Sequence, residues 1–151
     1  MEHNAIMLVG RINALSNRWL TDELSAAGLA GMVPSHGDVL ALLFAKGNAT
    51  MHELAAFAHR TKPTTTVLVD KLEKLGFVRR KDSPDDARSV VVSLTPAGEA
   101  LRGKYESISR RLVRRVYAPL GKAEGETFET LLTKVLANLE TEAKSEKGQI
   151  E

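Results

Sequence analysis

The sequence predicts a mainly α-helical fold with one small β-hairpin, and three observations between residues 50 and 95 support this prediction. Apolar residues recur at helical spacing over 51–59 and 63–75, with a short polar turn between the two runs. Two β-rich runs, 77–81 and 89–94, enclose a loop of aspartate, serine and proline. A hydroxyl residue and a proline at 95–96 then begin another helix. This order is that of a helix-turn-helix followed by a β-hairpin wing.

Two helices are expected before this segment. The first spans about 4–26 and carries an apolar stripe at helical spacing. The stripe consists of Leu8, Ile12, Leu15 and Trp19. Pro34 opens the second helix, where Ser35 and Asp38 have the spacing of a capping box variant. Its residues 39–44 are apolar on nearly all sides, so we expect this helix to lie at the centre of the fold.

The two helices of the helix-turn-helix have clear start signals. Thr50 and Glu53 form a capping box for the helix 51–59, and Pro63 suits the first turn of the helix 63–75. This second helix has one apolar stripe that would hold it on the body of the protein. The stripe consists of Thr65, Leu68, Leu72 and Leu75. The opposite side presents small polar and basic residues, which is typical of a recognition helix.

Two further helices are expected after the hairpin, over 96–118 and about 123–144, and both carry apolar stripes. Such stripes need a partner surface. The terminal helices either pack on each other within one chain or interlock with a second copy. At 151 residues we expect a single domain over 1–151, with a winged core at about 35–98 and flanking helices at about 4–26 and 99–144.

The composition excludes several classes of protein. A hydrophobic content of 43% and a charged content of 26% are ordinary for a soluble globular chain. The absence of cysteine excludes disulfides, thiolate catalysis and zinc–thiolate sites. No apolar run approaches the roughly 20 residues of a membrane span, and no signal peptide is apparent. We therefore expect a cytoplasmic protein without a membrane partner.

The basic residues are concentrated in the middle of the chain. The net charge is only +2, yet residues 60–89 hold eight lysines and arginines against five acidic residues. The last dozen residues are acidic instead. Electrostatic attraction to a polyanion would therefore centre on the helix-turn-helix and its wing.

Three stretches of the sequence resemble one family. The run 68–80 (LVDKLEKLGFVRR) looks like the winged helix-turn-helix of the MarR family. The loop 86–89 (DARS) matches that family's Asp-x-Arg-Ser wing signature, and 94–98 (LTPAG) matches the helix start that follows it. The resemblance implies a homodimeric transcriptional regulator, usually a repressor, that binds a near-palindromic operator. It also implies modulation by a small, often aromatic or anionic, effector. Many members carry a basic residue where this chain has Val67.

DNA contacts are expected from the recognition helix and the wing. The candidates are Lys62, Thr64, Thr65, Thr66, Val67, Lys71, Arg80, Lys81, Asp86, Arg88 and Ser89. Threonine and lysine near a helix N-terminus suit phosphates, and Val67 can meet a thymine methyl group. Arg88 would reach the minor groove or nearby phosphates while Asp86 fixes the loop. The alternative is that these residues form an ordinary exposed helix face and a solvated turn.

The effector pocket is expected between the flanking helices and the winged core. Its candidate residues are Arg11, Trp19, His36, Val39 and Leu43. Trp19 has the competing interpretation of plain core or dimer packing. A separate arginine cluster at 110–115 is either a solvated face or a further contact for phosphate or an anionic effector.

Metal and catalytic sites are not expected, and no cofactor is implied. His52 and His59 lie about 10.5 Å apart along a helix, too far to share one ion. The helix 96–118, which supplies ligands in zinc-responsive members of the resembling family, contains no histidine. Ser35, His36 and Asp38 are sequence neighbours, whereas a catalytic triad converges from separate segments. The alternatives to a DNA reader are a winged-helix protein-interaction module and a metal-responsive regulator.

Overall fold

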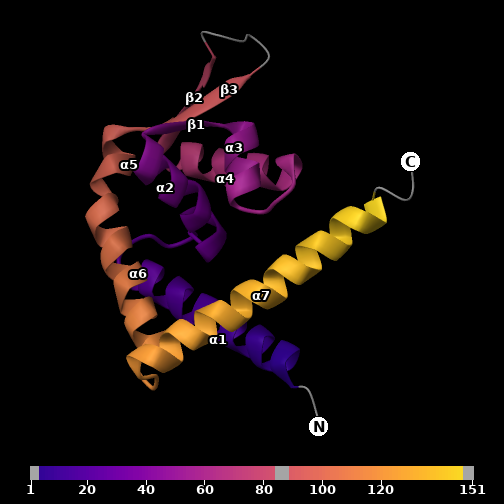
Figure 1. Ribbon diagram of the computed structural model, residues 1–151. Coiled ribbons are helices and arrows are strands. Elements are labelled where there is room, and N and C mark those ends of the chain that lie inside the picture. The colour runs from indigo at the N-terminus through magenta and orange to yellow at the C-terminus, as the bar shows by residue number, and fades with distance from the viewer. Residues whose placement is uncertain (1–3, 84–88, 148–151) are drawn as a thin grey trace. The chain divides into compact units, whose positions relative to one another are not determined.

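The computed structural model describes residues 4–83 and 89–147, and its helices and strands follow the predicted order (Figure 1). By contacts it divides into two compact units, one ending at Leu112 and one beginning at Val113. The elements are α1 (Ala5–Ala26), α2 (Pro34–Lys46), β1 (Asn48–Thr50), α3 (Met51–Phe57), α4 (Lys62–Lys74), β2 (Val78–Asp82), β3 (Val90–Leu94), α5 (Pro96–Ala100), α6 (Arg102–Tyr117) and α7 (Lys122–Lys147). The expected single domain over 1–151 stays a prediction.

The hairpin of β2 and β3 belongs to a sheet of three antiparallel strands in the order β1-β3-β2. Val78 pairs with Leu94 at the base of the hairpin, and Thr50 of β1 pairs with Val91. The sequence predicted the hairpin but not β1. Because β3 is the central strand, it joins the wing directly to the segment that starts α3 (Figure 1).

The core of the first unit is built around α2, as its apolar sequence predicted. Val39, Leu40 and Leu43 of this helix have no exposed surface. The other large side chains that are fully buried come from α1 and the loop after it, from α3, from α4 and from the sheet. They are Leu24, Met32, Leu54, Val69, Leu72, Val78 and Val92.

The helix caps agree with the sequence at two of three expected positions. The hydroxyl of Thr50 accepts from the Glu53 amide at 3.1 Å, while the Glu53 carboxylate accepts from the Thr50 amide at 2.8 Å. Thr95 likewise caps α5 by accepting from the amide of Gly98 at 3.1 Å. The expected cap from Ser35 is wrong, because Val33 is the N-cap of α2. The Val33 amide donates a hydrogen bond to the ring nitrogen Nδ1 of His36.

The helix expected over 96–118 is interrupted at Leu101, which separates α5 from α6. The start of α5 packs against the chain that enters β2. The Thr95 amide donates to the carbonyl of Phe77 at 3.0 Å, and the Thr95 hydroxyl donates to the carbonyl of Gly76 at 2.5 Å. A Cβ on Gly98 would lie 1.9 Å from the Phe77 carbonyl oxygen, so only glycine allows this approach.

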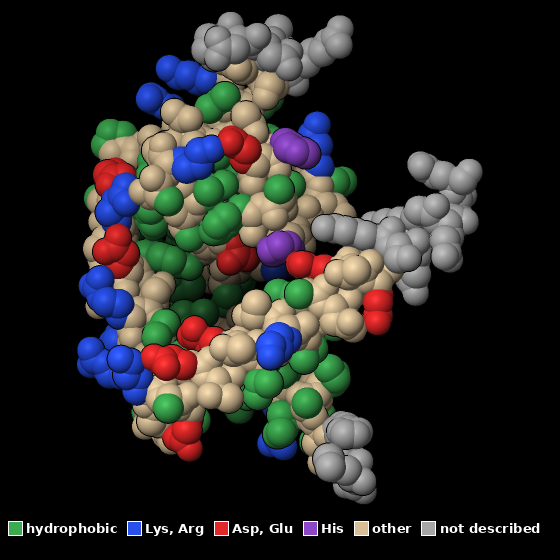
Figure 2. All heavy atoms as spheres, in the orientation of Figure 1, with side chains coloured by type: hydrophobic (Ala, Val, Ile, Leu, Met, Phe, Trp, Pro, Cys, Tyr) green, Lys and Arg blue, Asp and Glu red, His purple; other side chains and the backbone are tan. Residues whose placement is uncertain are grey.

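Apolar side chains remain exposed on α1 and on α7, the terminal helices of the chain. Figure 2 shows such side chains gathered at the N-terminal end of α1, where Ile6, Met7 and Leu8 are more than half exposed. On α7 the exposed apolar side chains recur on one side of the helix. They are Leu131, Leu132, Val135, Leu136 and Leu139. Within the described ranges, no helix combines the length and apolarity that a bilayer span requires.

Candidate nucleic-acid interface

The turn between α3 and α4 sets the direction of the second helix. His59 lies in this turn with φ of 50°, a left-handed conformation that is uncommon for a residue with a side chain. The turn is tied to α2 because the guanidinium of Arg60 donates to the Ser35 hydroxyl at 2.9 Å. Thr61 then caps α4 by accepting from the Thr64 amide at 3.4 Å. The N-terminus of α4 is therefore held in a defined direction relative to α2.

Helix α4 has one buried and one exposed side, as a recognition helix requires. Its buried residues are Thr65, Leu68, Val69 and Leu72. On the free side Val67 is 66% exposed, and Lys62 and Thr64 are also exposed. Thr66 is half-buried, and its hydroxyl donates to the carbonyl of Lys62 at 2.9 Å. The free side thus offers two polar residues in the first turn and an apolar side chain one turn later.

One residue of the predicted DNA-contacting set is buried. Thr65 has no exposed surface, and its hydroxyl donates to the carbonyl of Thr61 at 3.0 Å. The prediction of a DNA contact from Thr65 is therefore wrong. Its spacing with Leu68 and Leu72, which indicated a buried stripe, was the better guide to its position.

The wing places its basic residues on a short two-stranded ribbon. Lys81 of β2 is exposed, and Ser89 lies half-buried just before β3, where its carbonyl accepts from the Ser83 amide at 2.8 Å. Asp86 and Arg88 lie outside the described residues. DNA contacts from Lys81, Asp86, Arg88 and Ser89 stay predictions.

The guanidinium of Arg80 pairs with side chains of the recognition helix. Its guanidinium pairs with Asp70 at 2.5 Å and with Glu73 at 2.8 Å. It also donates to the carbonyl of Thr66 at 3.3 Å, while its amide donates to Glu73 at 3.0 Å. The charge of Arg80 did not reveal these partners, and its contact with DNA stays a prediction.

Lys71 is exposed on α4, and its side chain extends towards the loop between α1 and α2. A Cβ built on Gly31 would lie 3.4 Å from its ammonium nitrogen. The imidazole of His36 is 5% exposed, and its Nδ1 accepts the Val33 amide at 2.9 Å. Burial lowers the pKa of His36, and the positive charge of Lys71 lowers this pKa further.

Acidification is expected to destabilise the protein through His36. Because its pKa is lowered in the folded state, the unfolded chain binds the proton more readily, and stability is lost as the pH falls through about 6.5. We expect the thermal unfolding midpoint to fall between pH 7 and pH 5. His36→Gln should flatten this pH dependence, because it removes the buried imidazole. Equal slopes in the wild type and His36→Gln would contradict this assignment.

The five residues expected to form an effector pocket do not line a common cavity. Val39 and Leu43 are fully buried core residues, so their assignment to a pocket is wrong. His36 is buried as well. Trp19 packs against the core, with the guanidinium carbon of Arg111 5.7 Å from its ring centroid, and Arg11 is exposed two turns earlier on α1.

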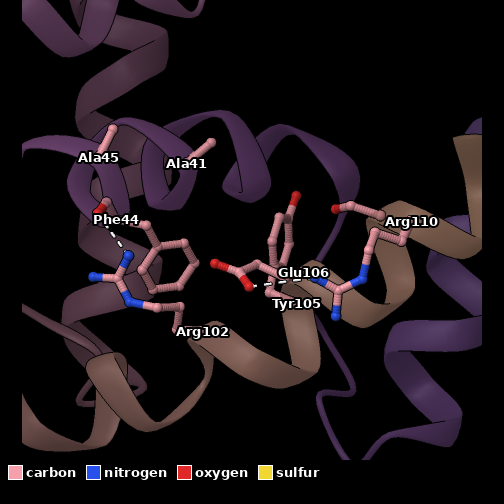
Figure 3. A pocket seen from close by; sticks show the side chains of 8 residues that line it. Ala41, Phe44, Ala45, Arg102, Tyr105, Glu106 and Arg110 are labelled. Carbon is pink, nitrogen blue, oxygen red and sulfur yellow. Dashed lines mark hydrogen bonds and ion pairs between the residues drawn. The ribbon is translucent and has the colours of Figure 1, made fainter.

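An open cavity of about 420 Å³ lies instead between α2 and α6 (Figure 3). Its lining residues are Ala41, Phe44, Ala45, Arg102, Tyr105, Glu106, Ser109 and Arg110. The rings of Phe44 and Tyr105 lie 6.0 Å apart between centroids. Figure 3 shows Arg102 and Arg110 at opposite ends of the cavity, with Glu106 between them. The sequence offered the spacing of 102, 105 and 109 along α6, but not the matching positions on α2.

The two arginines of this cavity differ in how firmly they are held. Arg102 pairs with Glu99 at 2.5 Å, donates to the Phe44 carbonyl at 2.7 Å and lies over the Phe44 ring. Arg110 contacts Glu106 only at 3.6 Å. Burial and the charge of Asp38 raise the pKa of Tyr105 to about 12, so its phenol is neutral at physiological pH. The cavity therefore combines an apolar floor with one loosely held cation.

Metal-binding clusters were sought in residues 4–83 and 89–147. In these ranges, no group of three or more histidine, aspartate or glutamate side chains is placed to hold an ion.

An exposed second helix, a capped turn and a basic β-ribbon beside it define a winged helix-turn-helix protein of the DNA-binding class. Comparison with known proteins gives the family. The model of the MarR family matches residues 34–90. The uncharacterized HTH-type transcriptional regulator YfiV of Bacillus subtilis is 36% identical over 107 residues, which cover 69% of this chain and 67% of YfiV. The chain belongs to the MarR family of transcriptional regulators.

Solved structures support the same assignment. A MarR-family regulator from Silicibacter pomeroyi is 32% identical and covers 89% of this chain and 88% of its own, with a TM-score of 0.70. A mutant of MarR from E. coli, complexed with operator DNA, is 28% identical and covers 88% of this chain and 96% of its own, with a TM-score of 0.75.

Proposed function

We propose that the chain is a homodimeric repressor of transcription that binds a near-palindromic operator in the cytoplasm. A small effector would change its affinity for this operator. The observation that carries this proposal is the free side of α4, where Lys62, Thr64 and Val67 are exposed beside the basic strand β2. The operator complex of the E. coli relative supports the choice of double-stranded DNA as the partner.

The free side of α4 suits the major groove. Lys62 and Thr64 lie in the first turn, where the amides of a helix N-terminus attract phosphate. Val67 follows one turn later and presents methyl groups without any hydrogen-bonding atom. Such a side chain fits against the methyl group of a thymine and would select an A·T pair at that position.

The exposed apolar faces of α1 and α7 support a dimer. Each helix carries several large apolar side chains that are more than half exposed, and exposed apolar side chains in such numbers favour an interaction surface. A second copy presents the same faces, and a two-fold axis would place two recognition helices about one turn of DNA apart. We therefore assign these faces to the contact between two copies of the chain.

The cavity between α2 and α6 is the site that we propose for a small aromatic acid. The neighbouring rings of Phe44 and Tyr105 suit an aromatic ring, and Arg110 is available to a carboxylate. A ligand there would shift the equilibrium between two shapes by its difference in affinity for them. Titration with benzoate tests the idea. Bound benzoate should alter the operator affinity of the wild type but not that of an Ala41→Phe variant, in which the larger side chain would fill the cavity.

Selection of bound sequences from random duplex DNA tests the proposed function. We expect two inverted half-sites, and an affinity that falls steeply with salt because bound lysine and arginine release counterions from the DNA. A winged-helix module that binds only proteins would enrich no sequence and show weak dependence on salt. That result would overturn the proposal.

Val67→Ala is expected to change base preference instead of general affinity. Losing the methyl contact should cost about 1 kcal/mol at one A·T pair of each half-site and little at other positions. Lys62→Ala is the matched comparison, because removing a phosphate contact should weaken binding to all duplexes alike. Titrations with the selected and scrambled duplexes measure both effects. The assignment fails if Val67→Ala weakens every duplex equally.

A further inference from the structure

We propose that Arg80 is a positioning residue that fixes the wing to the recognition helix, so that both can contact one duplex at the same time. This inference rests on the proposed function and adds a role that the basic charge of Arg80 did not suggest. Arg80 would contact no phosphate itself. Its effect on DNA binding would come from where it holds strand β2.

The contacts of Arg80 run along a single side of α4. Thr66, Asp70 and Glu73 are spaced i, i+4 and i+7, so they lie on successive turns of one helix face. The guanidinium reaches all three, through the carbonyl of Thr66 and the carboxylates of Asp70 and Glu73. One side chain of β2 thus spans two turns of the helix that would enter the groove.

The main chain of β2 is held by the same cluster. The amide of Arg80 donates to one carboxylate oxygen of Glu73, while its guanidinium pairs with the other. Two bonds between one strand residue and one helix residue fix both the distance and the orientation between β2 and α4. In the sheet Arg80 pairs with Val92, so the constraint passes to the central strand β3.

The chemistry of arginine is needed for this role. Its planar guanidinium carries five donors, which can serve two carboxylates and a carbonyl together. A lysine would keep the positive charge but could not bridge the same three acceptors. The cluster also neutralises Asp70 and Glu73, which would otherwise repel the phosphates that the recognition helix approaches.

The decisive variant is the pair Asp70→Asn and Glu73→Gln, which breaks the cluster without removing Arg80. Electrostatics alone predicts tighter DNA binding, because two negative charges beside the duplex are lost. The positioning role predicts the opposite: affinity for the selected operator should fall about 10-fold or more, with little change on scrambled DNA. Tighter binding to the operator would overturn the proposal.

Footprinting provides a readout that general destabilisation would not give. In the Asp70→Asn, Glu73→Gln variant, protection by the wing should be lost while major-groove protection by α4 remains. Loss of both in proportion, or retention of both, would contradict the positioning role. Thermal unfolding of the free protein shows whether the variant is folded at the assay temperature.

Substitutions of Arg80 complete the test. Arg80→Lys and Arg80→Met should lose operator affinity alike, with the wild-type dependence of affinity on salt. If Arg80 binds phosphate, Arg80→Met should instead lower the salt slope by about one unit per protomer, and lysine should restore it. Arg79→Met is the matched control, because Arg79 is exposed on the same strand and donates to Ser93 at 3.4 Å. Should the wild type bind no duplex, the proposed function itself fails, which is a different result.

Discussion

Leu136→Glu is expected to convert the protein to a monomer and to reduce operator affinity by roughly 100-fold or more. Leu136 is 56% exposed on α7, in the middle of the apolar side of that helix. A carboxylate there would have to be buried between the two copies without a partner, which opposes association. Two linked recognition helices gain about two to four orders of magnitude in affinity over one, and a monomer forfeits this gain.

Light scattering during size-exclusion chromatography measures the first effect, and titration of a fluorescent operator duplex measures the second. Ala137→Glu is the control, because it adds the same charge to the next residue of α7, which points about 100° away around the helix. This control should remain a dimer with wild-type affinity. A Leu136→Glu protein that stays dimeric and binds normally would remove α7 from the proposed interface.

Gly98→Ala is expected to destabilise the winged core by about 2–4 kcal/mol. The added Cβ would meet the carbonyl oxygen of Phe77 at 1.9 Å and its carbon at 2.9 Å. These are backbone atoms at the entry to β2, so no side-chain rotation relieves the clash. The start of α5 would have to move away, breaking the two hydrogen bonds from Thr95 to Phe77 and Gly76.

Urea denaturation measures this loss as a lower midpoint of unfolding. Gly103→Ala is the matched control, since no described atom lies within 4 Å of the position its Cβ would take and the residue lies in α6. Alanine has the higher helix propensity, so this variant should gain up to about 1 kcal/mol. If Gly98→Ala unfolds at the wild-type midpoint, the close approach does not constrain the fold.

Much of the fold could be predicted because its signals are local in the sequence. The capping box of Thr50 and Glu53 and the cap of Thr95 each need only residues within one helical turn. The alternation of buried and exposed residues along α4 was equally visible in its spacing. The winged-helix fold followed from these signals, and the family followed from the resemblance of 68–80, 86–89 and 94–98 to its members. The comparisons confirm both.

Features that depend on distant residues were missed. Strand β1 has only three residues, and it is a strand because β3 pairs with it. The cap of α2 was assigned to Ser35, whose hydroxyl is instead occupied by Arg60 from the turn after α3. The break at Leu101 was also missed, although Gly98 and Gly103 flank it in the sequence.

The candidate site shows the same division. Exposure of Lys62, Thr64 and Val67 was predictable from helical periodicity, although their contacts with DNA stay predictions. The pairing of Arg80 with Asp70 and Glu73 could not be predicted because these partners lie on another element, and a basic residue looks the same in the sequence whether it pairs with DNA or with aspartate. The cavity could not be predicted from the sequence, because residues of α2 and α6 that are far apart in the chain form it together.

The strand order also governs when this protein can fold during its synthesis. β1 is made early, but its pairing partner β3 follows only after α3, α4 and β2 have been completed. Until β3 has been translated, β1 is therefore an unpaired edge. Strand β2, which packs against the recognition helix α4, also lacks its partner strand. A chain released before Leu94 would expose that edge, so the winged core becomes native only when its last strand has left the exit tunnel.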